Sequence, residues 1–119
     1  MVREKREIYS RIYSFVLEVL NFVKNVPRTT ENLVLIRQLV RSASSIGANA
    51  EEADASETKK EFIYRFTVSK KEAKETLYWI RLLSDHNPKL EKQAVVLLEE
   101  NEQLIAIISK IVINTKKRK

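Results

Sequence analysis

Residues 38–53 read QLVRSASSIGANAEEA, and this stretch decides the fold of the chain. Its apolar and small residues recur every three or four positions, which is the spacing of one face of an α-helix. They are Leu39, Ala43, Ile46, Ala50 and Ala53. A second set at the same spacing is polar and consists of Arg41, Ser45, Asn49 and Glu52. The stretch predicts the middle of a long helix with a specified polar face, either an internal polar network or a recognition surface.

The same periodicity continues through most of the chain. It predicts helices over residues 5–25, 31–55, 58–84 and 88–115. Pro27 ends the first helix, and Thr29 or Thr30 is a natural N-cap for the second. The third begins at a capping box that starts with Thr58, and Asn87 before Pro88 supplies the N-cap of the fourth. The expected fold is all-α, an antiparallel up-and-down four-helix bundle forming one domain over residues 1–119.

The bundle predicts partners for the polar face of the second helix. An antiparallel hairpin that turns near Glu57 places Arg41 close to Glu72 and Glu75, and Asn49 close to Arg65. We expect Arg41 to make a bidentate contact with one of the two glutamates, with Ser45 and Asn49 completing the network. Gly47, inside the same helix, costs about 1 kcal/mol relative to alanine and suggests a close contact with a neighbouring helix.

Apolar residues in the first and last helices form two stripes rather than one. Beside its core stripe the first helix carries Tyr9, Tyr13, Val16, Leu20 and Val23, and the last carries Leu98, Ile105 and Val112. A helix that is apolar on more than one side packs on more than one side. The sequence therefore predicts a homo-oligomer, the alternative being a monomer with a broad core face.

The net charge of +6 is concentrated at the end of the chain. The tail Lys116, Lys117, Arg118 and Lys119 carries +4 of it, which leaves +2 for the rest. This tail either contacts nucleic acid or forms a frayed, solubilising helix end. The absence of cysteine fits a cytoplasmic protein, and no apolar run approaches the length needed to span a membrane.

Signatures of catalysis are missing. The single histidine, His86, lies in a turn, and the chain has neither the cysteines of a zinc site nor the glycines of a phosphate loop. The acidic residues near the end of the second helix, Glu51, Glu52, Asp54 and Glu57, are interpreted as partners for Lys59, Lys60 or Arg65 across the turn. We expect no catalytic residue, no metal and no cofactor.

The third helix carries a cluster of lysines, Lys70, Lys71 and Lys74, one turn before Tyr78 and Trp79. Cations beside aromatic rings are typical of a nucleic-acid surface. The alternative is that Glu72 and Glu75 neutralise the cluster and that Trp79 belongs to the core or to an interface.

Two signatures resemble those of the 23S rRNA-intervening sequence protein family, also called the S23 ribosomal protein family. They are residues 38–49, followed by Glu52, Ala53, Ser56, Lys60 and Phe62, and residues 71–80. Residues 22–28 resemble the end of the family's first helix, whereas residues 50–53 depart from its usual pattern. The resemblance implies a bacterial homopentamer with a central channel, similar to basic accessory proteins of diversity-generating retroelements that bind nucleic acid and a reverse transcriptase.

Two functions follow as hypotheses. The first is a non-enzymatic oligomer that binds nucleic acid, rRNA or another RNA or DNA, through its lysines. The second is a protein-interaction scaffold, such as an accessory subunit of another enzyme, with no direct role on nucleic acid. An enzyme with a site between subunits is a third, weaker hypothesis because the residues for chemistry are missing.

Overall fold

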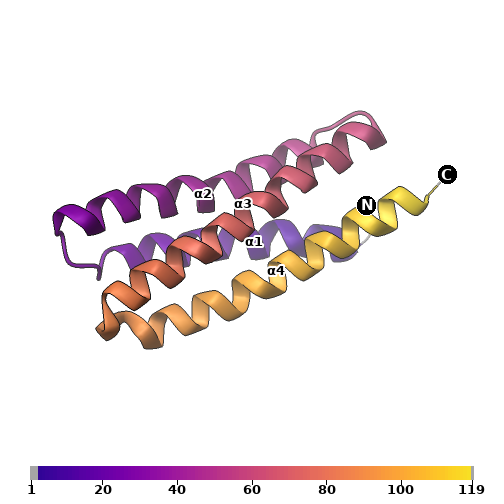
Figure 1. Cartoon of the computed structure of the whole chain (residues 1–119). Coiled ribbons are helices and arrows are strands. Elements are labelled where there is room, and N and C mark those ends of the chain that lie inside the picture. Colours follow the sequence, from indigo (N-terminus) through magenta and orange to yellow (C-terminus); the bar gives the residue numbers. More distant parts are fainter. Residues whose placement is uncertain (1–2, 119) are drawn as a thin grey trace.

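Four long helices make up the protein (Figure 1). The computed structural model describes the backbone of residues 3–118 and the side chains from residue 7 onward within that range. The elements are α1 (Arg3–Val23), α2 (Thr30–Asp54), α3 (Lys59–His86), the 3-10 turn η1 (Pro88–Leu90) and α4 (Glu91–Lys117). The predicted all-α class is confirmed, and the boundaries agree to within a few residues.

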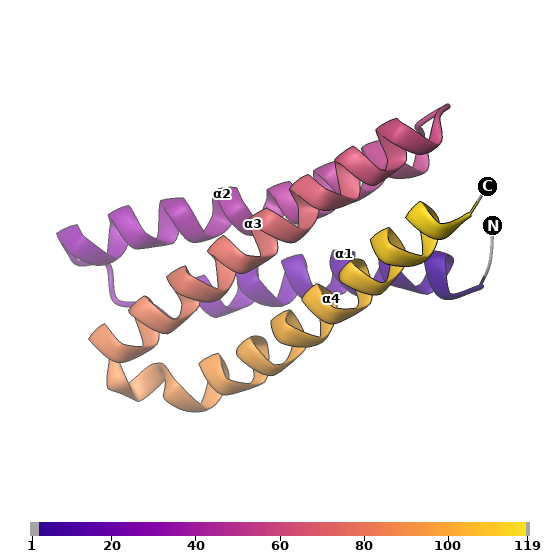
Figure 2. The same cartoon turned by 45° about the vertical axis from the view of Figure 1, so that its right-hand side comes forward.

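The helices run antiparallel in chain order, as an up-and-down bundle does (Figures 1 and 2). α1 packs on α2 and α4, and α3 packs on the same two helices, so α1 and α3 lie diagonally opposite. The start of α1, the α2–α3 turn and the end of α4 lie at one end of the molecule (Figure 1). The bundle is 51 Å long and about 20 Å across, which is what helices of this length dictate.

The predicted core stripes are buried. The first stripe consists of Ile8, Ile12, Phe15, Val19 and Phe22 in α1 and Val26 just after it, and each is at most 3% exposed. In α2 and α3 the inward positions are smaller, and Ala43, Ala50, Ala53 and Ala73 are buried completely or nearly so. Such small side chains let the two helix backbones approach each other closely.

Buried polar side chains form hydrogen bonds between α2 and α3. The hydroxyl groups of Ser42 and Thr76 lie 2.8 Å apart, and Ser69 donates to the Ile46 carbonyl oxygen at 2.8 Å. All three side chains are buried, so each hydroxyl needs its partner inside the protein. These hydrogen bonds fix the register of α3 against α2.

Two of the three predicted caps form side-chain hydrogen bonds. The hydroxyl oxygen of Thr29 accepts from the Asn32 N–H at 3.2 Å, and that of Thr58 accepts from the Glu61 N–H at 3.1 Å. Asn87 takes the predicted N-cap position before Pro88, but the helical turn that follows is η1 and the Asn87 side chain makes no capping hydrogen bond. It instead exchanges two hydrogen bonds, of 2.9 and 3.0 Å, with the amide of buried Asn32. This pair joins the first turn of α2 to the α3–α4 turn.

Polar side chains also join α1 to α4, at the edge of their contact. Arg11 donates to both carboxylate oxygens of Glu100, at 2.6 and 3.1 Å, and to the side-chain oxygen of Gln103 at 3.0 Å. The hydrogen bond to Glu100 raises the pKa of the Arg11 guanidinium above its ordinary value. Nearer the other end of these helices, Asn25 donates to Gln93 at 3.1 Å.

The second apolar stripes of α1 and α4 differ in how far they are buried. On α1, Tyr13 and Leu20 are exposed, and Leu17 beside them is 47% exposed. On α4 the predicted stripe turns inward instead, because Leu98 and Ile105 are partly buried against the core and Val112 is buried. Exposed apolar side chains are therefore present on both terminal helices. On α4 they are Val95, Val96 and Ile113 rather than the residues of the predicted stripe.

Gly47 tests how tightly α1 and α2 pack. A methyl group added there would lie 3.6 Å from the Ile12 Cγ2 atom and 3.9 Å from that of Val16, which are ordinary van der Waals distances. The tight contact expected from the sequence is therefore absent.

We expect Gly47→Ala to raise the free energy of unfolding by up to about 1 kcal/mol, because alanine favours the helix and the space exists. Urea denaturation measures this, and a loss of stability would show that the helices are closer than described.

Candidate nucleic-acid interface

The three lysines predicted as a binding surface lie on the side of α3 that faces away from α2. Lys71 and Lys74 are exposed and Lys70 is partly buried. Within residues 7–118 no carboxylate forms an ion pair with any of them. Their charges therefore remain available to an external anion.

The glutamates that could have neutralised these lysines are held elsewhere. Arg41 reaches across from α2 and forms ion pairs with Glu72, at 3.3 Å, and with Glu75. Its Nε atom also lies within hydrogen-bonding distance of the Gln38 side-chain oxygen. The predicted pairing is present, but each glutamate takes one guanidinium nitrogen, so the bidentate contact with a single glutamate is wrong. Both carboxylates are drawn to the α2 flank of α3.

A second cluster lies two to three turns further along the same α2 face. Arg65 of α3 donates to the Asn49 side-chain oxygen at 3.3 Å and pairs with Glu52 at 3.2 Å. The Ser45 hydroxyl belongs to neither cluster, and only its backbone carbonyl oxygen accepts a hydrogen bond, from Asn49. The polar face is therefore two separate clusters rather than one network. We call them together the α2–α3 polar seam.

Trp79 sits where the seam meets the outer face of α3. Its indole N–H donates to Glu75 at 2.9 Å, and its ring packs edge-on against Tyr78 with centroids 4.9 Å apart. Trp79 is partly buried, whereas Tyr78 is 53% exposed. The tyrosine, rather than the tryptophan, presents its ring to solvent beside the lysines.

Two further cations extend the surface beyond the predicted lysines. Lys60 and Arg81 are exposed, and within residues 7–118 neither takes part in an ion pair. Arg81 lies seven residues after Lys74, and Lys60 lies fourteen residues before Lys74, so the three share one line along the helix. That spacing was readable in the sequence, although the direction of the face was not. We call Lys60, Lys70, Lys71, Lys74 and Arg81 the α3 cationic face.

The basic tail lies at the end of the bundle where α3 begins. Lys116, Lys117 and Arg118 are exposed, and Lys119 lies outside the described residues. The Lys59 ammonium donates to the Arg118 carbonyl oxygen, which ties the end of α4 to the start of α3. The tail therefore lies beside the start of α3.

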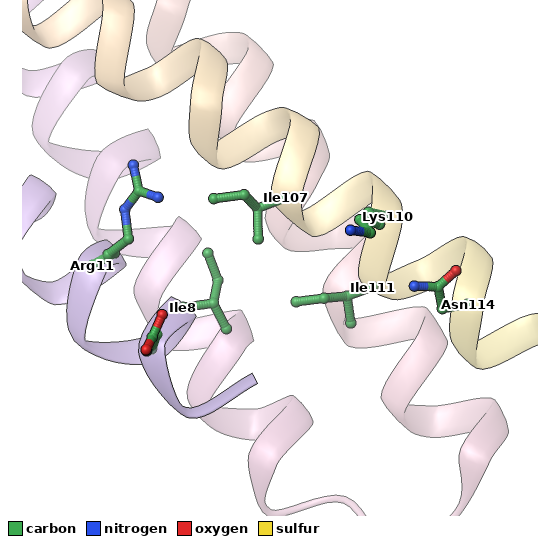
Figure 3. A pocket seen from close by; sticks show the side chains of 7 residues that line it. Ile8, Arg11, Ile107, Lys110, Ile111 and Asn114 are labelled. Atoms are coloured by element: carbon green, nitrogen blue, oxygen red, sulfur yellow. The ribbon is translucent and has the colours of Figure 1, made fainter. Parts of the chain in front are cut away.

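The described residues also line hollows on the surface of the bundle. A pocket of about 180 Å³ lies between α1 and α4, with Ile8, Ile107 and Ile111 on its walls and Lys110 and Asn114 beside it (Figure 3). It is smaller than the roughly 300 Å³ at which small-molecule sites begin. A wider hollow of about 530 Å³ lies between α3 and the start of α4, with Arg81, Asp85 and Glu91 among its lining residues. In the part of the chain that the structure describes, no group of three or more acidic or histidine side chains could hold a metal ion. No described helix is both long and apolar enough to cross a bilayer.

Comparison with known proteins shows which family the chain belongs to. The family model of the 23S rRNA-intervening sequence protein matches residues 4–110, almost the whole bundle. The chain belongs to this family. The family membership confirms the resemblance read from the two signatures on α2 and α3.

A solved relative has the same fold. It is the crystal structure of a protein of unknown function from the S23 ribosomal protein family of Bacteroides thetaiotaomicron. It is 25% identical, and the alignment has a TM-score of 0.84 and covers 92% of this chain and 97% of the relative. Among curated proteins, none matches the chain.

Arg41 offers a direct test of the seam. We expect Arg41→Met to lower the free energy of unfolding by no more than about 1 kcal/mol, because the side chain is 46% exposed and solvent screens its ion pairs. The substitution should nevertheless change the fluorescence of Trp79, whose indole N–H shares Glu75 with Arg41. Urea denaturation followed by tryptophan emission measures both. A native emission spectrum identical to that of the wild type would contradict the described contacts.

Proposed function

We propose that the protein is a non-enzymatic, homo-oligomeric module of the cytoplasm that binds RNA or DNA by charge. The observation that carries the proposal is the α3 cationic face, whose lysines form no ion pair among the described residues because Arg41 of α2 holds Glu72 and Glu75. A face of this kind suits a phosphate backbone, which releases condensed counterions when cations bind it. The exposed tail adds further charges beside the start of α3.

Assembly would multiply these charges. The exposed apolar side chains of α1, Tyr13, Leu17 and Leu20, lie on the helix diagonally opposite α3. Burying this α1 surface between copies would leave every α3 cationic face free. The family resemblance implies a homopentamer, and a ring would bring the cations of several chains onto one nucleic acid, which raises the overall affinity.

The second candidate function is a protein-interaction scaffold. The same α1 surface favours it, because exposed contiguous apolar side chains mark protein-binding surfaces. In that case the partner would occupy α1 and the cations would be solubilising. The two candidates differ in whether nucleic acid binds at all and in whether binding depends on α3.

The lysines supply the test of nucleic-acid binding. We expect the triple variant Lys70→Gln, Lys71→Gln, Lys74→Gln to bind labelled RNA and DNA at least 10-fold more weakly at about 50 mM salt. The slope of its log affinity against log salt concentration should also be smaller, by the equivalent of about two to three phosphate contacts. Deletion of residues 116–119 should weaken binding separately. Fluorescence anisotropy at several salt concentrations measures the affinities.

A matched control removes three lysines from the other end of the bundle. Lys24, Lys89 and Lys92 are exposed, and changing all three to glutamine lowers the net charge equally. If the control and the α3 variant lose affinity to the same extent, charge alone matters and the assigned face is wrong. If the wild type does not bind at any salt concentration, the scaffold function replaces this proposal.

Oligomerisation has its own test. We expect light scattering at micromolar concentration to give a mass several times the 13.9 kDa of one chain. Leu17→Glu should dissociate the assembly, because it buries a charge in the proposed interface. Ile113→Glu, at an exposed apolar position on α4, is the matched control and should leave the mass unchanged. A monomer in the wild type would contradict the assembly proposal.

A further inference from the structure

Two exposed tyrosines flank the central lysine of the α3 cationic face. Tyr64, Lys71 and Tyr78 follow one another at intervals of seven residues, so they share one line along α3. Tyr64 is 59% exposed and Tyr78 is 53% exposed. The two rings are separated by about 21 Å along the helix axis, at 1.5 Å per residue. Lys71 lies midway between them, and Lys74 lies one turn before Tyr78.

Each tyrosine contacts a residue that the α2–α3 polar seam holds in place. The edge-on partner of Tyr78 is Trp79, whose indole is hydrogen-bonded to Glu75, the carboxylate that pairs with Arg41.

At the other cluster, the Arg65 guanidinium lies 5.4 Å from the centre of the Tyr64 ring and is itself held by Asn49 and Glu52. Both clusters of the seam therefore end at an exposed aromatic ring. Rings fixed in this way lose little conformational freedom when a ligand covers them.

We infer that the outer face of α3 binds a single strand of nucleic acid, with unpaired bases stacked on Tyr64 and Tyr78 and phosphates bound between them by Lys71 and Lys74. This inference rests on the proposed function and narrows it to single strands. A duplex presents phosphates but hides the flat faces of its bases, so it can use only the cations. A single strand can use both, because every base has a face that stacks on an aromatic ring. Stacking and phosphate contacts are common to RNA and DNA, so strands of both kinds are ligands of this face.

The experiment compares affinities for matched probes. Labelled 12-nucleotide RNA and DNA strands of the same mixed sequence, and the DNA duplex of that sequence, are titrated by fluorescence anisotropy. We expect Tyr64→Leu and Tyr78→Leu each to weaken single-strand binding about 10-fold and to change duplex binding less than twofold. The matched control is Tyr13→Leu, an exposed tyrosine on α1, which should change neither affinity.

Trp79 supplies a second readout because it is the only tryptophan in the chain. A base stacked on Tyr78 lies beside the indole and should change its emission when the strand saturates the protein. Tyr64→Leu should retain this change, and Tyr78→Leu should lose most of it. Circular dichroism confirms that the variants are folded.

Two results would overturn the inference. One is unchanged Trp79 emission at saturating strand; the other is a tyrosine effect that is absent or equal for strands and duplex. Neither result touches the proposed function if the lysine triple variant still weakens every probe. If the lysine triple variant binds all probes like the wild type, the proposed function fails first, and the inference fails with it.

Discussion

The close packing of α2 against α3 is the constraint on which the arrangement of the protein depends. Alanines and hydroxyl side chains at the interface allow the two backbones to come together, and the Ser42–Thr76 and Ser69–Ile46 hydrogen bonds fix their relative register. A shift by one helical turn would break both contacts. Ser42 and Thr76 would keep their hydrogen bonds to carbonyl oxygens of their own helices, whereas buried Ser69 would lose its partner at a cost of about 1–3 kcal/mol. The same register is what brings Arg41 opposite Glu72 and Glu75.

The polar seam that this register creates contributes more to orientation than to stability. Its ion pairs are partly exposed to solvent, and such pairs each contribute little free energy. Their effect is to draw two carboxylates to one flank of α3 and to hold an arginine and a tryptophan against neighbouring tyrosines. The lysines of the α3 cationic face form no ion pair among the described residues. The result is a molecule with an apolar outer surface on α1 and a cationic, aromatic outer surface on the diagonal helix.

Most of the fold could be predicted from the sequence, because the apolar stripes repeat with the period of a helix over four long segments. The caps at Thr29 and Thr58 followed from local chemistry, and so did the pairing of Arg41 with the glutamates of α3. The N-cap position of Asn87 followed in the same way, but its side-chain partner did not, because capping is a local rule and that partner, Asn32, lies 55 residues away in the sequence.

The site was less predictable than the fold. The lysines were visible in the sequence. Whether they form ion pairs depends on the partners of Glu72 and Glu75, and Arg41 of α2 takes both glutamates. The buried Asn101 of α4 gave no signal either. In the amide orientation that satisfies both its polar atoms, it donates to the Ala73 carbonyl oxygen at 3.2 Å and accepts from the Leu77 N–H at 3.1 Å. Contacts of this kind become apparent only when the helices are placed together.

Photocrosslinking of the full-length protein to a single-stranded RNA that contains 4-thiouridine, followed by mass spectrometry of the peptides, tests the central claim most directly. The account predicts crosslinks on α3 peptides at Tyr64, Tyr78 or the lysines between them, and their loss when an excess of unlabelled strand competes. Crosslinks confined to α1, or to the turn between α1 and α2, would contradict it, because they would place the nucleic acid on the face assigned here to protein contacts.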